Sequence, residues 1–178
     1  LEAPSFELAM GALLHDVGKP GTFEDASDRI RFHGHDELGA SMSEKICERL
    51  RLSRRQTDRI VYLVRRHLVF MNILQMRLAR RYRVFEEDGF DQLMDLCRAD
   101  CLGSHQDMSL YNDCLALWNQ WKELAPSTEP LLQGRDLMKL GMKPGPEIGT
   151  MLEQLEDARR ESVVSDRAEA VAWVKARL

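Results

Sequence analysis

The sequence lacks the features of several common classes of protein. Only four of its 178 residues are cysteine, and no two of them form a Cys-x-x-Cys pair, so we interpret them as reduced thiols rather than a disulfide framework. No apolar run approaches the roughly 18 residues of a membrane helix, and no basic-then-apolar signal peptide opens the chain. We therefore expect a cytoplasmic protein with no membrane partner.

Charge is spread unevenly along the chain. The formal total is only −4, which taken alone argues against a protein that coats nucleic acid. Between Arg49 and Arg83, however, there are eleven arginines and a single acid, Asp58, so this segment carries +10 and the rest of the chain −14. Such an asymmetry predicts a surface for a polyanion.

Apolar residues recur at helical spacing almost everywhere, and no convincing alternating strand is present, so the sequence predicts an all-α fold. Ser5 is a candidate N-cap, and Ser-Arg-Arg-Gln beginning at Ser53 is typical of a capping box. Glycine and proline predict a loop at 17–34. The expected helices are 5–15, 36–50, 53–70, 74–84, 89–104, 109–124, 135–140, 146–162 and 166–177.

One segment is the best candidate for a domain boundary. Residues 125–134 contain Pro126, Ser127, Thr128, Pro130 and Gly134. We therefore expect a helical bundle at 1–125 and a small C-terminal helical tail at 126–178. The chain starts at Leu1 without methionine, which suggests a piece of a longer protein.

Two good metal ligands stand side by side where the first helix is expected to end. The stretch LLHDVGKP, residues 13–20, places His15 and Asp16 at that point, where both side chains can turn toward a common cation. Helical bundles build metal sites from imidazoles and carboxylates on several helices. Further ligands that qualify by residue type are His33, His35, His67 and Asp100.

A set of motifs in fixed order resembles a known family. The motifs are LLHDVGKP, RIRFHGHDELGA, LVRRHLVFMN, RADCLGSH and LLQGRDLMKLGMKPGPEIG, and together they cover nearly the entire chain. They resemble the HD superfamily of metal-dependent phosphohydrolases, and more closely the HD-domain half of bacterial tRNA nucleotidyltransferases and poly(A) polymerases. The resemblance implies an HD-domain helical bundle followed by an RNA-facing tail.

The resemblance also implies roles for individual residues. It assigns a divalent metal, Mg, Mn, Ni, Co or Fe, to the His-Asp pair and the distal aspartate, and less firmly to two further histidines. The implied ligands are His15, Asp16, His35, His67 and Asp100. Asp16 and Lys19 are the catalytic candidates, with Lys19 placed to neutralise a substrate phosphate. A cation of this kind activates water near neutral pH, which favours phosphoester hydrolysis.

Two functions of different classes remain open. One is a metal-dependent phosphohydrolase or phosphodiesterase that acts on phosphomonoesters or 2′,3′-cyclic phosphates at the 3′ end of tRNA or another RNA. The alternative is a non-catalytic tRNA-binding module that supports a nucleotidyltransferase head. No Gly-Ser followed by Asp-x-Asp occurs, so we expect no nucleotide addition by this chain. No histidine occurs among its first fourteen residues, where the family's upstream ligand would be sought, so we expect weak metal binding.

Seven basic residues are candidates for RNA binding: Arg65, Arg66, Arg77, Arg80, Arg81, Lys139 and Lys143. The five arginines have no acid four residues away, which favours contact with an RNA backbone over a salt-bridged solvated face. The two lysines flank the start of KPGPEIG, where exposed amides at a new helix can hold a phosphate.

Simpler roles are expected at other positions. His35 and His67 could instead be hydrogen-bonded, partly buried histidines. His33 and His105 are more typical of a loop and a helix end. Cys97 and Cys101 lie four apart on one expected helix face and are more typical of small buried hydrophobes than of ligands. The oligomeric state is left open.

Overall fold

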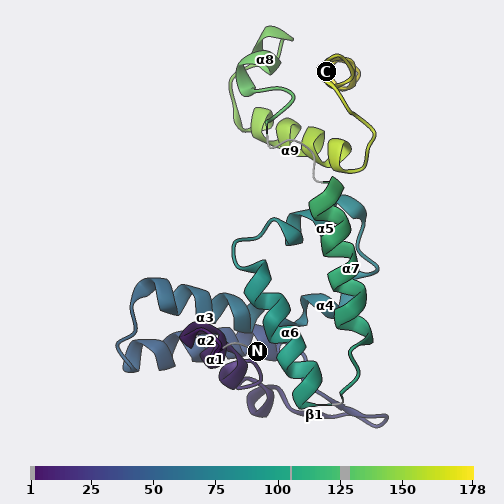
Figure 1. Cartoon of the computed structure of the whole chain (residues 1–178). Helices are drawn as coiled ribbons and strands as arrows, with labels where there is room; N and C mark the ends of the chain where they lie inside the picture. Colours follow the sequence, from purple (N-terminus) through teal and green to yellow (C-terminus); the bar gives the residue numbers. More distant parts are fainter. Residues whose placement is uncertain (1–2, 105, 125–128) are drawn as a thin grey trace. The chain divides into compact units, whose positions relative to one another are not determined.

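The computed structural model describes residues 3–104, 106–124 and 129–178, and it confirms the all-α fold (Figure 1). The main helices are α1 (Phe6–Leu14), α2 (His35–Arg49), α3 (Arg54–Arg66), α4 (Phe70–Ile73), α5 (Leu78–Phe85), α6 (Phe90–Gly103), α7 (Ser109–Leu124), α8 (Gly134–Lys139), α9 (Pro146–Arg160) and α10 (Arg167–Lys175). Within this described part of the chain, no helix is long and apolar enough to cross a membrane.

Local capping explains where two of the helices start. The Ser5 hydroxyl accepts a hydrogen bond from the Leu8 amide at 3.2 Å, and this cap begins α1. Ser53 and Gln56 form the reciprocal capping box that the sequence predicts at the start of α3. Gly34 has φ +75° directly before α2, a conformation that costs glycine little.

The expected loop at 17–34 contains more structure than the sequence indicates. A short 3-10 helix, η1 (Lys19–Thr22), is followed by a two-stranded antiparallel hairpin, β1 (Glu24–Asp25) and β2 (Ile30–Arg31). Strands of two residues are too short to show alternation. The expected helix 53–70 also ends early, at Arg66, and continues as the 3-10 turn η2 (His67–Val69) and α4.

The chain divides into two compact units, 1–75 with 87–118, and 76–86 with 119–178. In the first unit, α2 and α3 pack together and α1 lies across α3. Gly11 of α1 lies so close to Leu63 that a β-carbon would come within 2.8 Å of its side chain. One buried core cluster of this unit consists of Leu14, Ala40, Cys47, Ile60, Val61 and Val64.

The second unit joins the tail to a segment far away in the sequence. Its buried core consists of Leu132, Leu137, Leu155, Ala158, Val164, Ala170 and Val174. Helix α5 packs on α9, where Arg83 Nη2 lies 2.6 Å from Asp157 Oδ2 and Arg160 Nη2 lies 2.7 Å from Glu86 Oε2. The expected boundary residues Pro126, Ser127 and Thr128 lie outside the described residues. The division at residue 125 stays a prediction about which part folds independently.

Candidate metal centre

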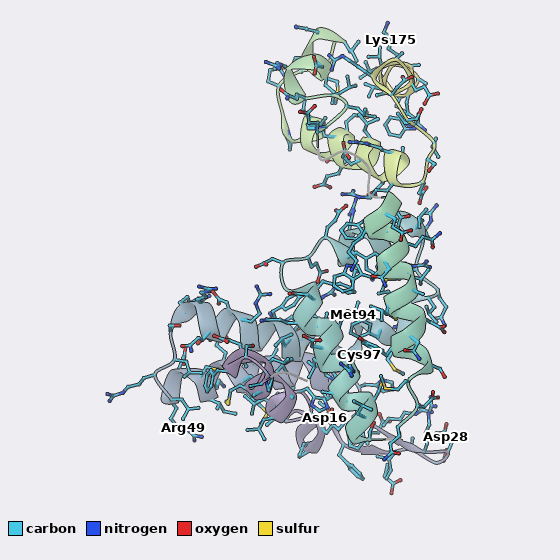
Figure 2. The ribbon with its side chains drawn as sticks, in the orientation of Figure 1. Asp16, Asp28, Arg49, Met94, Cys97 and Lys175 are labelled. Carbon is cyan, nitrogen blue, oxygen red and sulfur yellow. The ribbon has the colours of Figure 1, made fainter. Side chains whose placement is uncertain are left out.

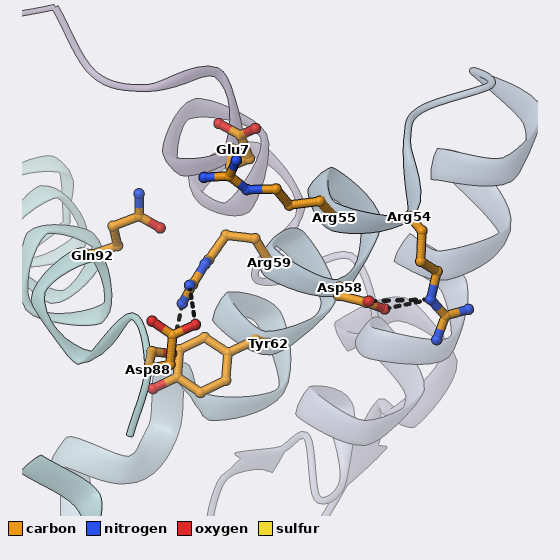
Figure 3. A pocket seen from close by; sticks show the side chains of 8 residues that line it. All are labelled: Glu7, Arg54, Arg55, Asp58, Arg59, Tyr62, Asp88 and Gln92. Carbon is orange, nitrogen blue, oxygen red and sulfur yellow. Dashed lines mark hydrogen bonds and ion pairs between the residues drawn. The ribbon is translucent and has the colours of Figure 1, made fainter. Parts of the chain in front are cut away.

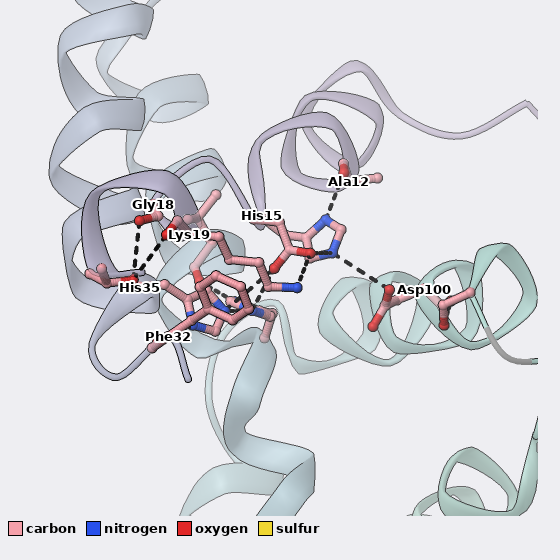
Figure 4. A network of polar contacts seen from close by, with 12 residues as sticks. Ala12, His15, Gly18, Lys19, Phe32, His35 and Asp100 are labelled. Atoms are coloured by element: carbon pink, nitrogen blue, oxygen red, sulfur yellow. Dashed lines mark hydrogen bonds and ion pairs between the residues drawn. The ribbon is translucent and has the colours of Figure 1, made fainter. Parts of the chain in front are cut away.

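Five side chains from four segments of the first unit gather at one place, which we term the candidate metal centre: His15, Asp16, His35, His67 and Asp100 (Figure 4). His15 follows the last residue of α1, and His67 follows the last residue of α3. His35 is the first residue of α2. At helix ends these side chains can meet without interrupting the backbone hydrogen bonds of the helices.

The three histidines of the centre are oriented in the same way. Each Nδ1 lies against the backbone carbonyl oxygen three residues earlier. The acceptors are the oxygens of Ala12, Phe32 and Val64, at 2.8, 2.8 and 2.6 Å respectively. Because a carbonyl oxygen only accepts, each Nδ1 carries the proton. In its neutral form each ring therefore has its Nε2 lone pair free for a ligand, as in metal-bound histidines.

The Nε2 lone pairs of His35 and His67 have little access to water. Their Nε2 atoms lie 3.1 Å apart, and both side chains are nearly buried. Two neutral imidazoles in this arrangement direct lone pairs at each other, which is unfavourable unless a proton or another cation lies between them. Burial lowers the pKa of His67, more than the Val64 carbonyl and Asp16 raise it, so an extra proton is disfavoured. A metal cation fits the donor set.

Asp16 lies between two groups of possible ligands, His35 with His67 and His15 with Asp100. Its Oδ1 is 3.4 Å from His35 Nε2 and 3.9 Å from His67 Nε2, while its Oδ2 is 3.3 Å from His15 Nε2. Ligand atoms about 2.0–2.2 Å from one cation are roughly 3–3.5 Å apart, so these separations need little adjustment. The possible ligand atoms of Asp16, His35 and His67 all lie within 4.8 Å of one another.

The second group joins Asp16 to the distal aspartate. His15 Nε2 is 3.5 Å from Asp100 Oδ1, on the third turn of α6. The structure therefore brings His15, Asp16 and Asp100 together, and Asp16 is shared between this group and His35 with His67. The Asp100 side chain is half exposed, so this side of the centre opens to solvent.

Lys19 is attached to the same aspartate. Its Nζ lies 2.6 Å from Asp16 Oδ2. Burial alone would raise the pKa of Asp16, but the hydrogen bond and the positive charge of Lys19, together with His15 and His67 whenever these rings are protonated, bring that pKa below its ordinary value. The carboxylate is therefore ionised and ready to hold a cation.

A pocket of about 260 Å³ opens beside the centre. It is lined by Ala12, His15, Asp16, Leu96, Ala99, Asp100, Gly103 and Ser104. The small side chains of Ala12 and Ala99 leave room next to the two carboxylates. Ala12 and Ala99 were not predicted from the sequence, because small residues on α1 and α6 have no pattern that separates a pocket wall from ordinary helix packing.

Other residues of the expected ligand type lie elsewhere. His33 is exposed at the end of the hairpin, and no described contact joins it to the centre. His105 lies outside the described residues. Cys97 on α6 is partly buried, and this burial strongly raises the pKa of its thiol (Figure 2), whereas Cys101 is buried.

Two arginines of α3 form ion pairs with acids that are distant in the sequence. Arg65 Nε donates to Glu37 Oε2 at 3.1 Å, and Arg66 Nε donates to Glu87 Oε2 at 3.0 Å. The acids are 28 and 21 residues away in the sequence. The lack of acids at i±4 therefore did not reveal that these two arginines are ion-paired.

Other arginines of α3 are also ion-paired, in a second pocket of about 760 Å³ along this helix (Figure 3). Here Arg54 pairs with Asp58, and Arg59 Nη2 lies 2.7 Å from Asp88 Oδ2. The remaining lining residues are Glu7, Arg55, Tyr62 and Gln92. The three arginines of this pocket are balanced by three acids, so it is not a simple anion site.

The other candidates for RNA binding lie in the second unit. Arg77 and Arg80 are exposed, and neither has an ion pair with any residue that the structure describes. Arg81 Nη2 donates to the Met76 carbonyl oxygen at 3.1 Å. Lys139, the last residue of α8, and Lys143 are exposed. RNA contact by these residues stays a prediction.

Comparison with known proteins gives a family and several relatives. The model of the family described as HD domain matches residues 2–103. The chain is 34% identical over 181 residues to the A-adding tRNA nucleotidyltransferase of Deinococcus radiodurans. This match covers 94% of the chain and 41% of that protein. It is 32% identical over 179 residues to the CC-adding tRNA nucleotidyltransferase of Thermus thermophilus, with 97% of the chain and 40% of that protein covered.

A more distant similarity is to an enzyme with a different activity in its name. A bifunctional uridylyltransferase/uridylyl-removing enzyme of Photobacterium profundum is 30% identical over 141 residues, which is 71% of the chain but only 14% of that enzyme. The chain spans about two fifths of the length of the two tRNA nucleotidyltransferases.

Proposed function

The chain belongs to the HD domain family, and from this premise we propose that the candidate metal centre holds a divalent cation and hydrolyses phosphoesters. The observation that carries the proposal is the 3.1 Å approach of His35 Nε2 to His67 Nε2, with both Nδ1 atoms engaged by backbone carbonyls. A cation between the two Nε2 atoms would satisfy both lone pairs, and ionised Asp16 lies beside them.

The types of ligand atom at the centre indicate which divalent metals it would prefer. Imidazole nitrogens suit iron, cobalt and nickel, whereas Mg²⁺ prefers oxygen ligands and retains waters. The three histidines therefore favour Fe, Co or Ni over Mg, and the two carboxylates are ligands that also suit Mn. A bound cation of this kind supplies Lewis-acid chemistry, since it activates water near neutral pH and withdraws charge from a phosphoryl oxygen.

The protein's own residues supply orientation and charge. Asp16 faces both groups of ligands, so its carboxylate would position the cation and the substrate phosphate. Lys19 Nζ holds Asp16 Oδ2 and can turn to a phosphate oxygen, because its side chain is partly exposed. The pocket beside Asp100 gives room for the leaving group of the ester.

The substrate class is supported by the relatives. Two of them have names that describe addition of nucleotides to tRNA. We propose phosphomonoesters or 2′,3′-cyclic phosphates at the 3′ end of tRNA or another RNA as substrates, in the cytoplasm. The half-exposed Asp100 side leaves the centre open to such an end.

The test is hydrolysis of 2′,3′-cyclic AMP with added Mn²⁺, Co²⁺ or Ni²⁺. The expected result is metal-dependent turnover that Asp16→Asn abolishes, because the amide keeps the shape but not the anionic ligand. Asp113→Asn, a change of the same kind at an exposed site on α7, serves as the control and should keep full activity. Equal rates for Asp16→Asn and unmodified protein would place the activity elsewhere.

A second function rests on a different observation. Arg77 and Arg80 are exposed and form no ion pair within the described residues, so they can contact an RNA backbone. A non-catalytic module would bind tRNA with a clear salt dependence but release no phosphate. Binding without hydrolysis under every metal tested would favour this alternative.

A further inference from the structure

Two aromatic rings beside the candidate metal centre belong neither to its ligands nor to the core clusters. Phe23 lies between η1 and β1, and Phe32 directly follows β2. Their ring centroids are 6.0 Å apart with an interplanar angle of 59°, so the two rings form an open corner. The Phe23 side chain is 56% exposed, whereas Phe70 and Phe90 of the same unit are 2% exposed.

Phe32 is tied directly to the centre. Its backbone oxygen accepts the hydrogen bond from His35 Nδ1 at 2.8 Å. Its ring lies under Lys19, with Nζ 5.7 Å from the ring centroid, and the same Nζ is 2.6 Å from Asp16 Oδ2 (Figure 4). The aromatic corner therefore begins where a phosphate held by Lys19 would lie.

Exposure of one phenylalanine is not informative by itself, since Phe6 on α1 is 48% exposed. What distinguishes Phe23 is its place beside Phe32, whose ring lies under Lys19 of the carboxylate-lined centre. A nucleotide has the matching arrangement of a phosphate and, a short distance away, a flat apolar base. Bases stack on aromatic side chains with little regard to base identity.

We propose that Phe23 and Phe32 form a stacking surface for the nucleobase of a substrate whose phosphate lies at Lys19 and Asp16. The inference rests on the proposed phosphoesterase function and deepens it: the preferred substrate is a nucleoside phosphate or the terminal nucleotide of an RNA, and a sugar phosphate alone is a weaker substrate. Phe23 is the specificity-determining residue, because its ring is the more exposed of the two. Phe32 positions both Phe23 and Lys19.

Binding to metal-stripped protein tests this without any turnover. Adenosine 2′-monophosphate and ribose 5-phosphate are titrated by calorimetry into the full chain. The nucleotide should bind tighter by roughly 5- to 150-fold, the range that one base–aromatic stack supplies. Phe23→Leu, which keeps apolar surface but removes the ring, should lose most of this difference, and Phe23→Tyr should retain it.

Phe6→Ala is the matched control, since Phe6 is similarly exposed but lies about nine residues, or roughly 13 Å of helix, before His15. It should leave the preference for the nucleotide unchanged. Equal affinity of the two probes, failure of both to bind, or full preference in Phe23→Leu would overturn the stacking surface. In the last case, Phe23 and Ile30 would instead be an apolar patch for another partner.

A separate assay distinguishes failure of the stacking surface from failure of the proposed function. Release of phosphate from ribose 5-phosphate with added Mn²⁺ reports the centre alone. Hydrolysis without any preference for a base would leave the phosphoesterase and overturn the stacking surface. Preference for the nucleotide in binding, with no hydrolysis of any substrate, would support the stacking surface and remove the phosphoesterase.

Discussion

His35 and His67 face each other through their Nε2 atoms at 3.1 Å, although 32 residues separate them in the sequence. Each ring is fixed from behind by a backbone carbonyl, so neither can rotate away without breaking a hydrogen bond. The pair is therefore preorganised for a cation, and removal of one ring should have a specific and measurable effect on metal binding.

The first prediction concerns stabilisation by metal. Addition of Mn²⁺ or Ni²⁺ at about 100 times the dissociation constant should stabilise the folded protein by about 2.7 kcal/mol, because the cation binds the native state. His67→Ala should lose most of this gain, measured by thermal unfolding with and without metal for each variant. His33→Ala removes an exposed histidine outside the centre and should keep it. Equal gains in both variants would mean that the metal binds elsewhere.

The second prediction concerns Gly18, which fixes the His-Asp segment to α2. A β-carbon at Gly18 would lie 2.2 Å from the His35 carbonyl oxygen and 2.7 Å from the Gly39 amide nitrogen. Both are backbone atoms, so relief requires movement of the start of α2. Gly18→Ala should destabilise the protein by about 1–3 kcal/mol or more and weaken metal binding, as urea unfolding and metal titration would show.

Gly149 provides a matched control in α9. A β-carbon there meets nothing within 4 Å, and alanine has the higher helix propensity. Gly149→Ala should therefore be neutral or stabilise by up to about 1 kcal/mol. If Gly18→Ala were equally harmless, the close approach of the His-Asp segment to α2 would not be important for stability.

The predictability of this site from sequence differs from residue to residue. His15 and Asp16 were predictable because adjacent ligands at a helix end are a local feature. The contribution of His35, His67 and Asp100 came from the family resemblance, since periodicity does not reveal which helix ends meet. The proposed role of Phe23 and Phe32 had no sequence signal, because strands of two residues show no alternation and the hairpin beside these residues was not predicted.

The fold shows the same division between local and long-range information. Helix positions follow from caps and apolar spacing, which are local, and most were predicted within a few residues. The packing of α5 on α9 through the Arg83–Asp157 pair joins residues 74 apart, and no local pattern indicates it. The pairing of Arg65 with Glu37 is hidden for the same reason.

The third prediction separates free arginines from paired ones. Arg77→Ala with Arg80→Ala should weaken tRNA binding and flatten the slope of log affinity against log salt by about 0.7–0.9 for each phosphate that is no longer neutralised. Arg54→Ala is the control, because Arg54 Nε already lies 2.9 Å from Asp58 Oδ1. Filter binding at several salt concentrations would show the effect. Unchanged slopes in the double variant would make Arg77 and Arg80 an ordinary solvated surface.

The last prediction separates the two roles of the ion pair between Lys19 and Asp16. Lys19→Ala removes the ammonium that would hold a substrate phosphate, but it leaves every proposed metal ligand in place. KM for 2′,3′-cyclic AMP should rise, by roughly 3- to 10-fold, since the partly exposed Lys19 is screened by solvent and its charge-assisted hydrogen bond falls at the weak end of the usual range. Retention of Mn²⁺, measured by elemental analysis after dialysis, should not fall, because Asp16 loses a competing cation. Lys45→Ala, at an exposed site on α2, should change neither quantity. A loss of Mn²⁺ in Lys19→Ala would show instead that Lys19 maintains the shape of the centre, and the phosphate-binding role would have to be given up.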